Sequence, residues 1–222
     1  MFESKYSKVL TIILVIVVLA IIGLIGFLGF QFYNNYIISK NTTDFVDNFQ
    51  GEIEDTTEEE KKNETGETSS IFDELKDAET KTGSTTAKKK TYQGFGVVGT
   101  IEIPKINLKY PIIERVTSKA LDVSVAYLYG TGINQPGNSV IIGHNYRNGL
   151  FFSNLKKVDI GDKVYIADNA GNKLTYNIYN KFETTPEDTS FYQRDTGGVP
   201  EITLSTCTDD ARQRTIVFAK AE

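Results

Sequence analysis

One uninterrupted apolar segment near the N-terminus constrains this chain more than any other feature. Residues 9–30 contain no charged side chain and consist almost only of Leu, Ile, Val, Ala, Gly and Phe. As a helix, these 22 residues extend roughly 33 Å, about the hydrocarbon thickness of a bilayer. The sequence therefore predicts one transmembrane helix at residues 9–30, after a short N-terminal segment at residues 1–8.

The charges on either side of this segment predict its orientation. Lys5 and Lys8 precede it, whereas the region that follows is acidic. The positive-inside rule then places residues 1–8 in the cytoplasm and the rest of the chain outside the cell. A cleaved signal peptide is the alternative, but its apolar core has about 7–15 residues and is followed by small residues. Residues 31–36 are Gln, Phe, Tyr and Asn only, so we expect an uncleaved signal anchor.

The next segment, residues 31–90, has the composition of a solvated spacer. Fourteen Asp or Glu stand against seven Lys between residues 41 and 90, with much Thr and Ser and few apolar residues. A segment of this kind buries too little apolar surface to offset its conformational entropy. We therefore predict an acidic, flexible extracellular tether, and we expect residues 91–222 to fold without it.

Residues 91–222 are predicted to form one mainly β domain. Their formal charge is near zero, which argues against a nucleic-acid partner. Apolar and polar residues alternate from Val97 to Ile103, and two further strands, Lys163–Ala167 and Leu174–Tyr179, flank a turn sequence at Asn169–Asn172. Many short strands with turn signals favour a closed barrel or a sandwich. Two short helices are also predicted, at Ser118–Val125 and Leu150–Leu155.

Three side chains with catalytic potential lie at the ends of predicted buried strands. Cys207, the only cysteine, ends one apolar run, and His144, the only histidine, ends another. Arg214 opens a third. A thiol that attacks, an imidazole that moves protons and a guanidinium that binds developing negative charge suffice for acyl transfer.

A structural reading of the same residues stays open. A lone cysteine is often a small buried hydrophobe, and a lone histidine is often structural. Transition-metal binding is not expected, because no second His or Cys completes a site. We therefore expect no cofactor, and a calcium site cannot be placed on particular carboxylates.

Several segments of residues 95–222 resemble the sortases, the membrane-anchored cysteine transpeptidases of Gram-positive bacterial surfaces. The cysteine motif and the arginine that follows it resemble the active-site signature of that family, and a histidine motif precedes them in the same order. An early strand also matches. The segments are Thr203–Cys207 with Arg214 and Thr215–Ala219, Ile142–Asn145 with Phe152–Leu155, and Tyr110–Ile113.

The resemblance implies an eight-stranded sortase-type β-barrel with short helices. It implies cleavage of an LPXTG-like C-terminal sorting signal, a thioacyl intermediate on Cys207, and transfer of the surface protein to an amine of a cell-wall precursor or pilin. His144 would be the general acid and base, and Arg214 would hold substrate or stabilise the oxyanion. Arg212 is the rival arginine and is expected in a solvent-facing loop. Thr206 and Asn145 are further substrate-binding candidates.

The subclass and two other functions stay open. The motifs resemble those of class B and class D sortases, whereas the compact domain is closer to classes A and D, and no Asp-Pro-aromatic lid of class C precedes the barrel. An extracellular cysteine hydrolase of wall peptides would use the same thiol and imidazole. A non-catalytic, surface-tethered binding module is the remaining alternative.

Overall fold

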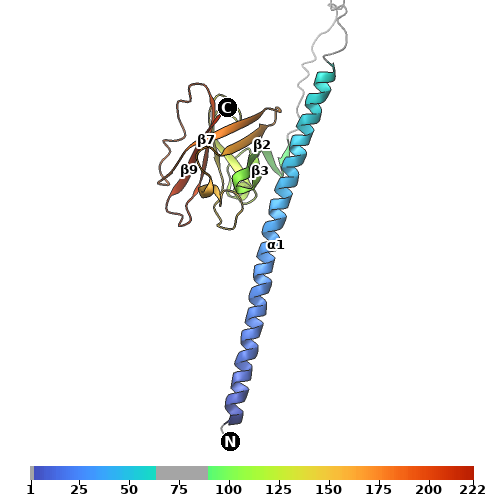
Figure 1. The fold of residues 1–222 in the computed structure, drawn as a ribbon, viewed down its shortest axis with the longest axis vertical. Coiled ribbons are helices and arrows are strands. Elements are labelled where there is room, and N and C mark those ends of the chain that lie inside the picture. Colours follow the sequence, from blue (N-terminus) through green and yellow to red (C-terminus); the bar gives the residue numbers. More distant parts are fainter. Residues whose placement is uncertain (1–2, 64–89) are drawn as a thin grey trace, which may run out of the picture. The chain divides into compact units, whose positions relative to one another are not determined.

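The computed structural model describes residues 3–63 and 90–222, which fall into two compact units, residues 1–41 and 42–222. The described residues of the first unit, 3–41, all belong to helix α1, Glu3–Asn63, drawn from blue to cyan in Figure 1. The segment Lys8–Gly51 contains a window with a mean hydropathy of 3.3, so this helix is long and apolar enough to cross a membrane. The large apolar side chains between residues 9 and 30 are exposed within the chain, as expected of side chains that face lipid.

The first half of the predicted flexible tether is helical in the structure, because α1 continues without a break to Asn63. Residues 31–63 contain no proline and a single glycine, and many of them are Glu or Lys, which are good helix formers. Residues 64–89, the rest of the predicted tether, lie outside the described part of the chain.

Nine strands form one sheet in the second unit, and eight of them close into a barrel. The sheet order is β1-β2-β3-β4-β5-β8-β9-β7-β6, and an additional pairing between β2 and β6 closes it. The two-residue β1 lies outside this ring. The mainly β class and the eight-stranded barrel are therefore confirmed. The strands are β1 Thr91–Tyr92, β2 Phe95–Ile103, β3 Leu108–Ile113, β4 Val125–Gly130, β5 Gly137–Ile142, β6 Lys163–Asp168, β7 Lys173–Thr184, β8 Pro200–Cys207 and β9 Arg214–Ala221.

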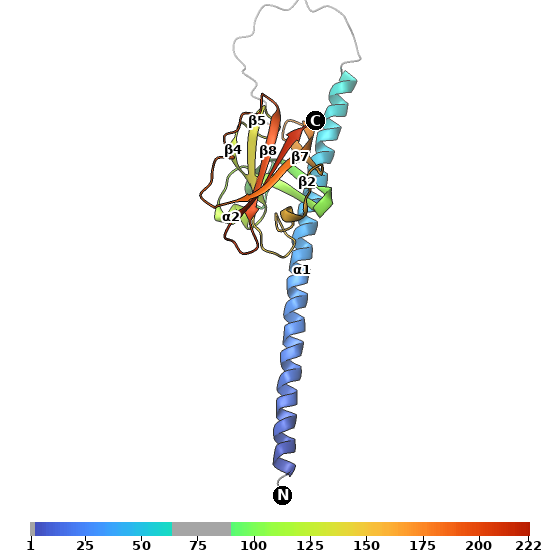
Figure 2. The same cartoon turned by 60° about the vertical axis from the view of Figure 1, so that its left-hand side comes forward.

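Most neighbouring strands are antiparallel, but the pairs β3–β4 and β5–β8 are parallel. Figure 2 shows β4, β5 and β8 side by side in the barrel wall. The predicted hairpin is present as β6 and β7, where the Asp168 carboxylate accepts hydrogen bonds from the backbone N–H groups of Ala170 and Asn172. This carboxylate closes the turn between the two strands.

The two predicted helices are shorter than expected or displaced. The first is α2, Ser118–Leu121, which begins where the Thr117 hydroxyl accepts a hydrogen bond from the N–H of Ala120. At Leu150–Leu155 the prediction is wrong: the only helical turn nearby in the described chain is the 3-10 turn η2, Leu155–Lys157. Phe151 has a φ of 51° and donates its N–H to the Tyr110 hydroxyl, so the backbone cannot continue as a helix there. A second 3-10 turn, η1, spans Pro104–Ile106.

The part of α1 that belongs to the second unit adds side chains to the hydrophobic core. Val46 and Phe49 of α1 are 0% and 2% exposed, and Phe49 shares one apolar cluster with Tyr92 and the barrel residues Val97 and Ile113. The folded unit therefore begins near residue 42, and the expectation that it begins at 91 needs this correction. The sequence shows only three apolar side chains in an acidic segment, too few to predict that they would be buried.

Candidate functional site

The barrel topology brings the three candidate catalytic residues to one edge. Cys207 is the last residue of β8, Arg214 is the first residue of β9, and the two are direct partners in that antiparallel pair. His144 lies two residues beyond the end of β5. Because β5 and β8 are parallel neighbours, their carboxyl ends reach the same edge of the sheet.

Close packing holds the segment that carries His144. At the neighbouring Gly143, an added Cβ would lie 2.8 Å from Val125 Cγ1 and 3.0 Å from a ring carbon of Phe152. No other residue fits there without a shift of these neighbours. The N–H of Gly143 donates to the Ser205 carbonyl at 3.2 Å, and its carbonyl accepts from the Thr206 hydroxyl at 2.8 Å. These bonds tie the histidine segment to the strand that ends in Cys207.

His144, Cys207 and Arg214 line one pocket of about 330 Å³ at this edge, and all three are half-buried. The Arg214 guanidinium donates a hydrogen bond from Nη1 to Cys207 Sγ at 2.9 Å. Apolar residues form much of the remaining wall. The pocket is completed by Leu121, Leu128, Ile142, Gly143, Pro186, Asp188, Phe191, Tyr192, Ser205 and Thr206.

The rival arginine lies elsewhere. The Arg212 side chain is 85% exposed in the loop between β8 and β9, and its Nε lies 3.9 Å from the carboxylate of Asp210. It does not line the pocket that contains Cys207. The structure thus separates the two arginines, and only Arg214 contacts the sulfur.

The two further substrate-binding candidates are engaged inside the chain. The Thr206 hydroxyl donates its hydrogen bond to the Gly143 carbonyl, and Thr206 is 4% exposed. The side-chain amide of Asn145 donates to the Cys207 carbonyl at 2.9 Å and to Asp209 Oδ1 at 3.0 Å. Both side chains therefore hold the backbone around Cys207.

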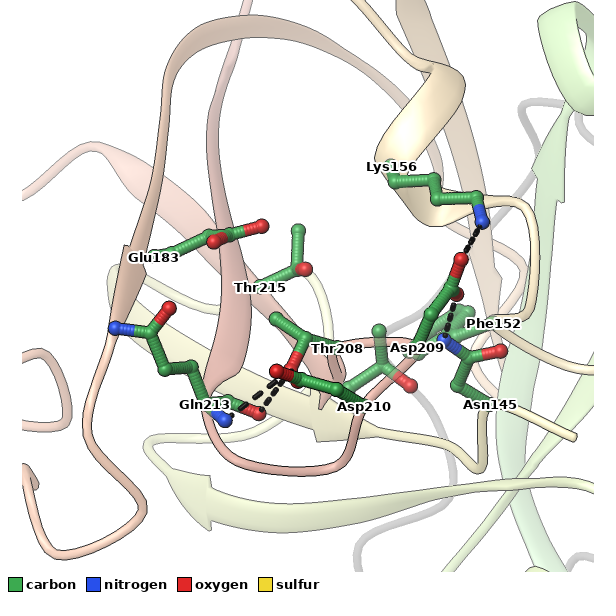
Figure 3. Close-up of a pocket in the computed structure, with 10 residues that line it drawn as sticks. Asn145, Phe152, Lys156, Glu183, Thr208, Asp209, Asp210, Gln213 and Thr215 are labelled. Carbon is green, nitrogen blue, oxygen red and sulfur yellow. Dashed lines mark hydrogen bonds and ion pairs between the residues drawn. The ribbon is translucent and has the colours of Figure 1, made fainter. Parts of the chain in front are cut away.

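A second cavity, of about 290 Å³, lies beside the loop between β8 and β9. Figure 3 shows Lys156 and Asn145 directed at the Asp209 carboxylate, with Glu183 and Thr215 on the other side of the cavity. The Lys156 ammonium group, followed by the Asn145 amide, lowers the pKa of Asp209. Thr206 lines both this cavity and the one with the three candidate residues.

Tyr146 packs against the candidate general base. Its ring centre lies 4.8 Å from that of His144, and its hydroxyl donates to the Asp122 carboxylate at 2.8 Å. Burial, together with this carboxylate, raises the pKa of Tyr146 from its ordinary value to about 12. The hydrogen bond to Asp122 holds the ring beside the imidazole.

No group of three or more His, Cys, Asp or Glu side chains that could hold a metal ion is found among residues 3–63 and 90–222. The sequence reasoning also missed part of the pocket wall, namely the loop between β7 and β8. Its only signal in the sequence is the aromatic pair Phe191-Tyr192 within an otherwise polar stretch.

Fold and site together define a closed β-barrel protein with a cysteine, a histidine and an arginine in one surface pocket. A family model described as Sortase domain matches residues 101–222. The chain therefore belongs to the sortase family.

Individual relatives agree with this assignment. Sortase A of Bacillus anthracis is 33% identical over 112 residues, which cover 50% of this chain and 52% of that protein. The solved structure of the Clostridium perfringens Sortase D5 transpeptidase superposes with a TM-score of 0.52 and 29% identity, over 57% of this chain and 79% of that one. Sortase C of Clostridium perfringens, solved with the C-terminal cell wall sorting motif, has a TM-score of 0.51 and 25% identity, over 57% and 70% of the two chains. The chain spans about half to two thirds of the length of its curated relatives.

Proposed function

We propose that this sortase is a cysteine transpeptidase that cleaves an LPXTG-like C-terminal sorting signal and transfers the new carboxyl group to an amine. The observation that carries the proposal is the shared pocket of His144, Cys207 and Arg214, with the guanidinium 2.9 Å from the sulfur. A related sortase C has been solved with a C-terminal cell wall sorting motif, which supports this substrate class.

In the first half of the reaction, the Cys207 sulfur attacks the carbonyl carbon of the scissile amide. His144 takes the proton of the thiol as the sulfur attacks and passes it to the leaving amine as the C–N bond breaks. The acyl group stays on sulfur as a thioester. The planar guanidinium of Arg214 donates beside the reacting sulfur, where negative charge develops on the carbonyl oxygen. Its fixed fork of donors suits this task better than an ammonium group.

In the second half, an incoming amine attacks the thioester carbonyl. His144 takes a proton from this amine and returns it to the sulfur as the C–S bond breaks, which restores the thiol of Cys207. Asn145 and Thr206 act by positioning, since one holds the Cys207 carbonyl and the other ties β8 to the histidine segment. The natural amine is proposed to belong to a peptidoglycan precursor or a pilin.

The apolar helix supports a location of this chemistry at the membrane. With Lys5 and Lys8 on the cytoplasmic side, the barrel lies outside, near surface proteins that await anchoring. Tethering enzyme and substrate to one surface raises their effective concentration without new contacts.

The full-length chain in detergent micelles tests the proposal. Incubated with a peptide that carries an LPXTG sequence, it is expected to gain the mass of the acyl fragment on Cys207, seen by intact mass spectrometry. Adding triglycine or a diaminopimelate-containing peptide should then divert the product from the free acid to the amide.

The Cys207→Ala variant is the matched control, because it removes the sulfur and little volume. It should form neither adduct nor product and should keep its circular-dichroism spectrum. Exclusive hydrolysis at saturating amine, for every sorting peptide tested, would favour the hydrolase. An active Cys207→Ala variant would refute the nucleophile assignment.

A further inference from the structure

The loop between β7 and β8, residues 185–199, forms one side of the candidate substrate pocket. It contributes four of the residues that line it: Pro186, Asp188, Phe191 and Tyr192. The loop has turns but no helix or strand of its own, so its shape depends on contacts with the barrel. Whatever holds this loop therefore shapes the pocket wall.

A buried asparagine of the barrel holds the aromatic part of the loop. The amide nitrogen of Asn138, on β5, donates to the carbonyl of Phe191 at 3.1 Å and to that of Tyr192 at 3.0 Å. Asn138 is 5% exposed, so these bonds form away from water, where unpaired carbonyls would be costly. Its oxygen accepts a hydrogen bond from the Thr203 hydroxyl at 2.9 Å.

An arginine from the loop itself completes the arrangement. Arg194 Nη2 donates to the Asn138 oxygen at 2.9 Å, and Nη1 donates to Glu201 Oε2 at 2.7 Å and to the Tyr179 hydroxyl. The guanidinium carbon lies 3.8 Å from the ring centre of Phe218. Side-chain exposures of 16% for Arg194 and 11% for Glu201 show that this ion pair is largely removed from water.

Such a pair costs desolvation energy, which only good geometry offsets. Arginine supplies that geometry, because one planar fork reaches Asn138 and Glu201 at once while its face lies on Phe218. Lysine has one compact ammonium group and cannot make these three contacts together.

We propose that Arg194 and Asn138 are positioning residues that hold the Phe191–Tyr192 wall in place and thereby determine how tightly and how selectively the sorting peptide binds. The inference rests on the proposed function for its substrate. Neither residue lines the pocket itself, so both act through the loop.

Two variants of the full-length chain test the proposal. Arg194→Lys keeps the charge but loses the fork. Asn138→Asp keeps an acceptor for Arg194 but can no longer donate to the two loop carbonyls. With an LPXTG peptide and triglycine, each variant is expected to raise KM roughly tenfold, to leave kcat within about twofold, and to change the order of preference among sorting peptides.

Asn134→Asp is the matched control. Asn134 is similarly buried, at 8% exposed, and its amide likewise donates to two backbone carbonyls, those of Ile166 and Asn172. It holds the β6–β7 hairpin and does not line the pocket. Its substitution should lower the thermal midpoint as Asn138→Asp does, yet leave KM and peptide preference unchanged.

Hydrogen–deuterium exchange separates this proposal from the proposed function. Both test variants should increase amide exchange across residues 186–193, and Asn134→Asp should not. If exchange and KM stay at wild-type values, or if exchange rises while KM and preference do not change, the positioning role is refuted. If the wild type processes no sorting peptide, the proposed function fails. Unchanged exchange in the variants would independently refute the positioning role of Arg194 and Asn138.

Discussion

Phe49 provides a direct test of whether residues 42–49 of helix α1 belong to the folded domain. Its ring is 2% exposed and packs in the cluster formed with Tyr92, Val97 and Ile113, and the Lys90 ammonium group lies 4.0 Å from the ring centre. The helix is also held by an ion pair between Asp47 and Lys109. The substitution Phe49→Ala removes the largest of these contacts.

The size of the effect follows from this burial. Phe→Ala in a protein core costs about 3–5 kcal/mol, and we take the low end because the helix can detach and relieve the cavity. For a unit of this size, about 3 kcal/mol lowers the melting temperature by roughly 6–12 °C. The assay is thermal unfolding of a soluble chain that begins at Thr42, the start of the compact unit.

Asn48→Ala is the control, since Asn48 lies next to Phe49 in the chain but is exposed, and its substitution should change the melting temperature little. A chain that begins at residue 91 lacks Val46 as well as Phe49 and should be at least as unstable as Phe49→Ala. Equal melting temperatures for all four proteins would show that residues 42–49 add nothing to the fold, and our reading of α1 would be wrong.

Further predictions concern the site. Arg214→Lys should lower kcat/KM with a sorting peptide by about 100-fold, because the planar donors beside Cys207 are lost. Arg212→Ala should leave kcat/KM within about twofold of the wild-type value. A larger loss for Arg212→Ala than for Arg214→Lys would overturn the assignment. Asn145→Ala should lower kcat/KM roughly tenfold, because it releases the Cys207 carbonyl, and wild-type kinetics would refute its positioning role. The lowered pKa of Asp209 means that its carboxylate stabilises the fold above the ordinary pKa and loses this contribution as pH falls through the lowered value. The difference in melting temperature between wild type and Asp209→Asn should therefore be largest near pH 7 and shrink as the pH falls below the ordinary pKa of an aspartate. A difference that does not shrink at low pH would show another cause.

The long apolar helix and the candidate residues could be predicted from the sequence because their signals are local. An apolar run of 22 residues without a charge has few stable environments other than a bilayer. Strand alternation and turn sequences similarly indicate a mainly β domain, and a single Cys, a single His and an Arg at strand ends limit the chemistry to a few residues. The closed barrel itself was expected from the resemblance to sortases, and residues 169–172 predicted the hairpin between β6 and β7.

What needed the tertiary structure depends on contacts between residues far apart in the chain. Burial of Phe49 requires the surface built by β2 and β3, and the acidic composition around it predicts the opposite. The displaced helical turn after residue 150 follows from one hydrogen bond to Tyr110, 41 residues away.

Contacts between residues far apart in the chain also distinguish the two arginines and hold the pocket wall in place. Alternation alone does not separate Arg212 from Arg214, and the resemblance to sortases favoured Arg214. The β8–β9 register places Arg214 opposite Cys207. Asn138 meets Arg194 across 56 residues of sequence, and neither belongs to a recognisable motif. Local propensity and periodicity act over a few residues, so they can predict which segments form strands. Which side chains meet at the barrel's edge depends on the tertiary structure. The parallel pairing of β5 with β8 and the packing of the β7–β8 loop against the barrel bring distant parts of the chain together there.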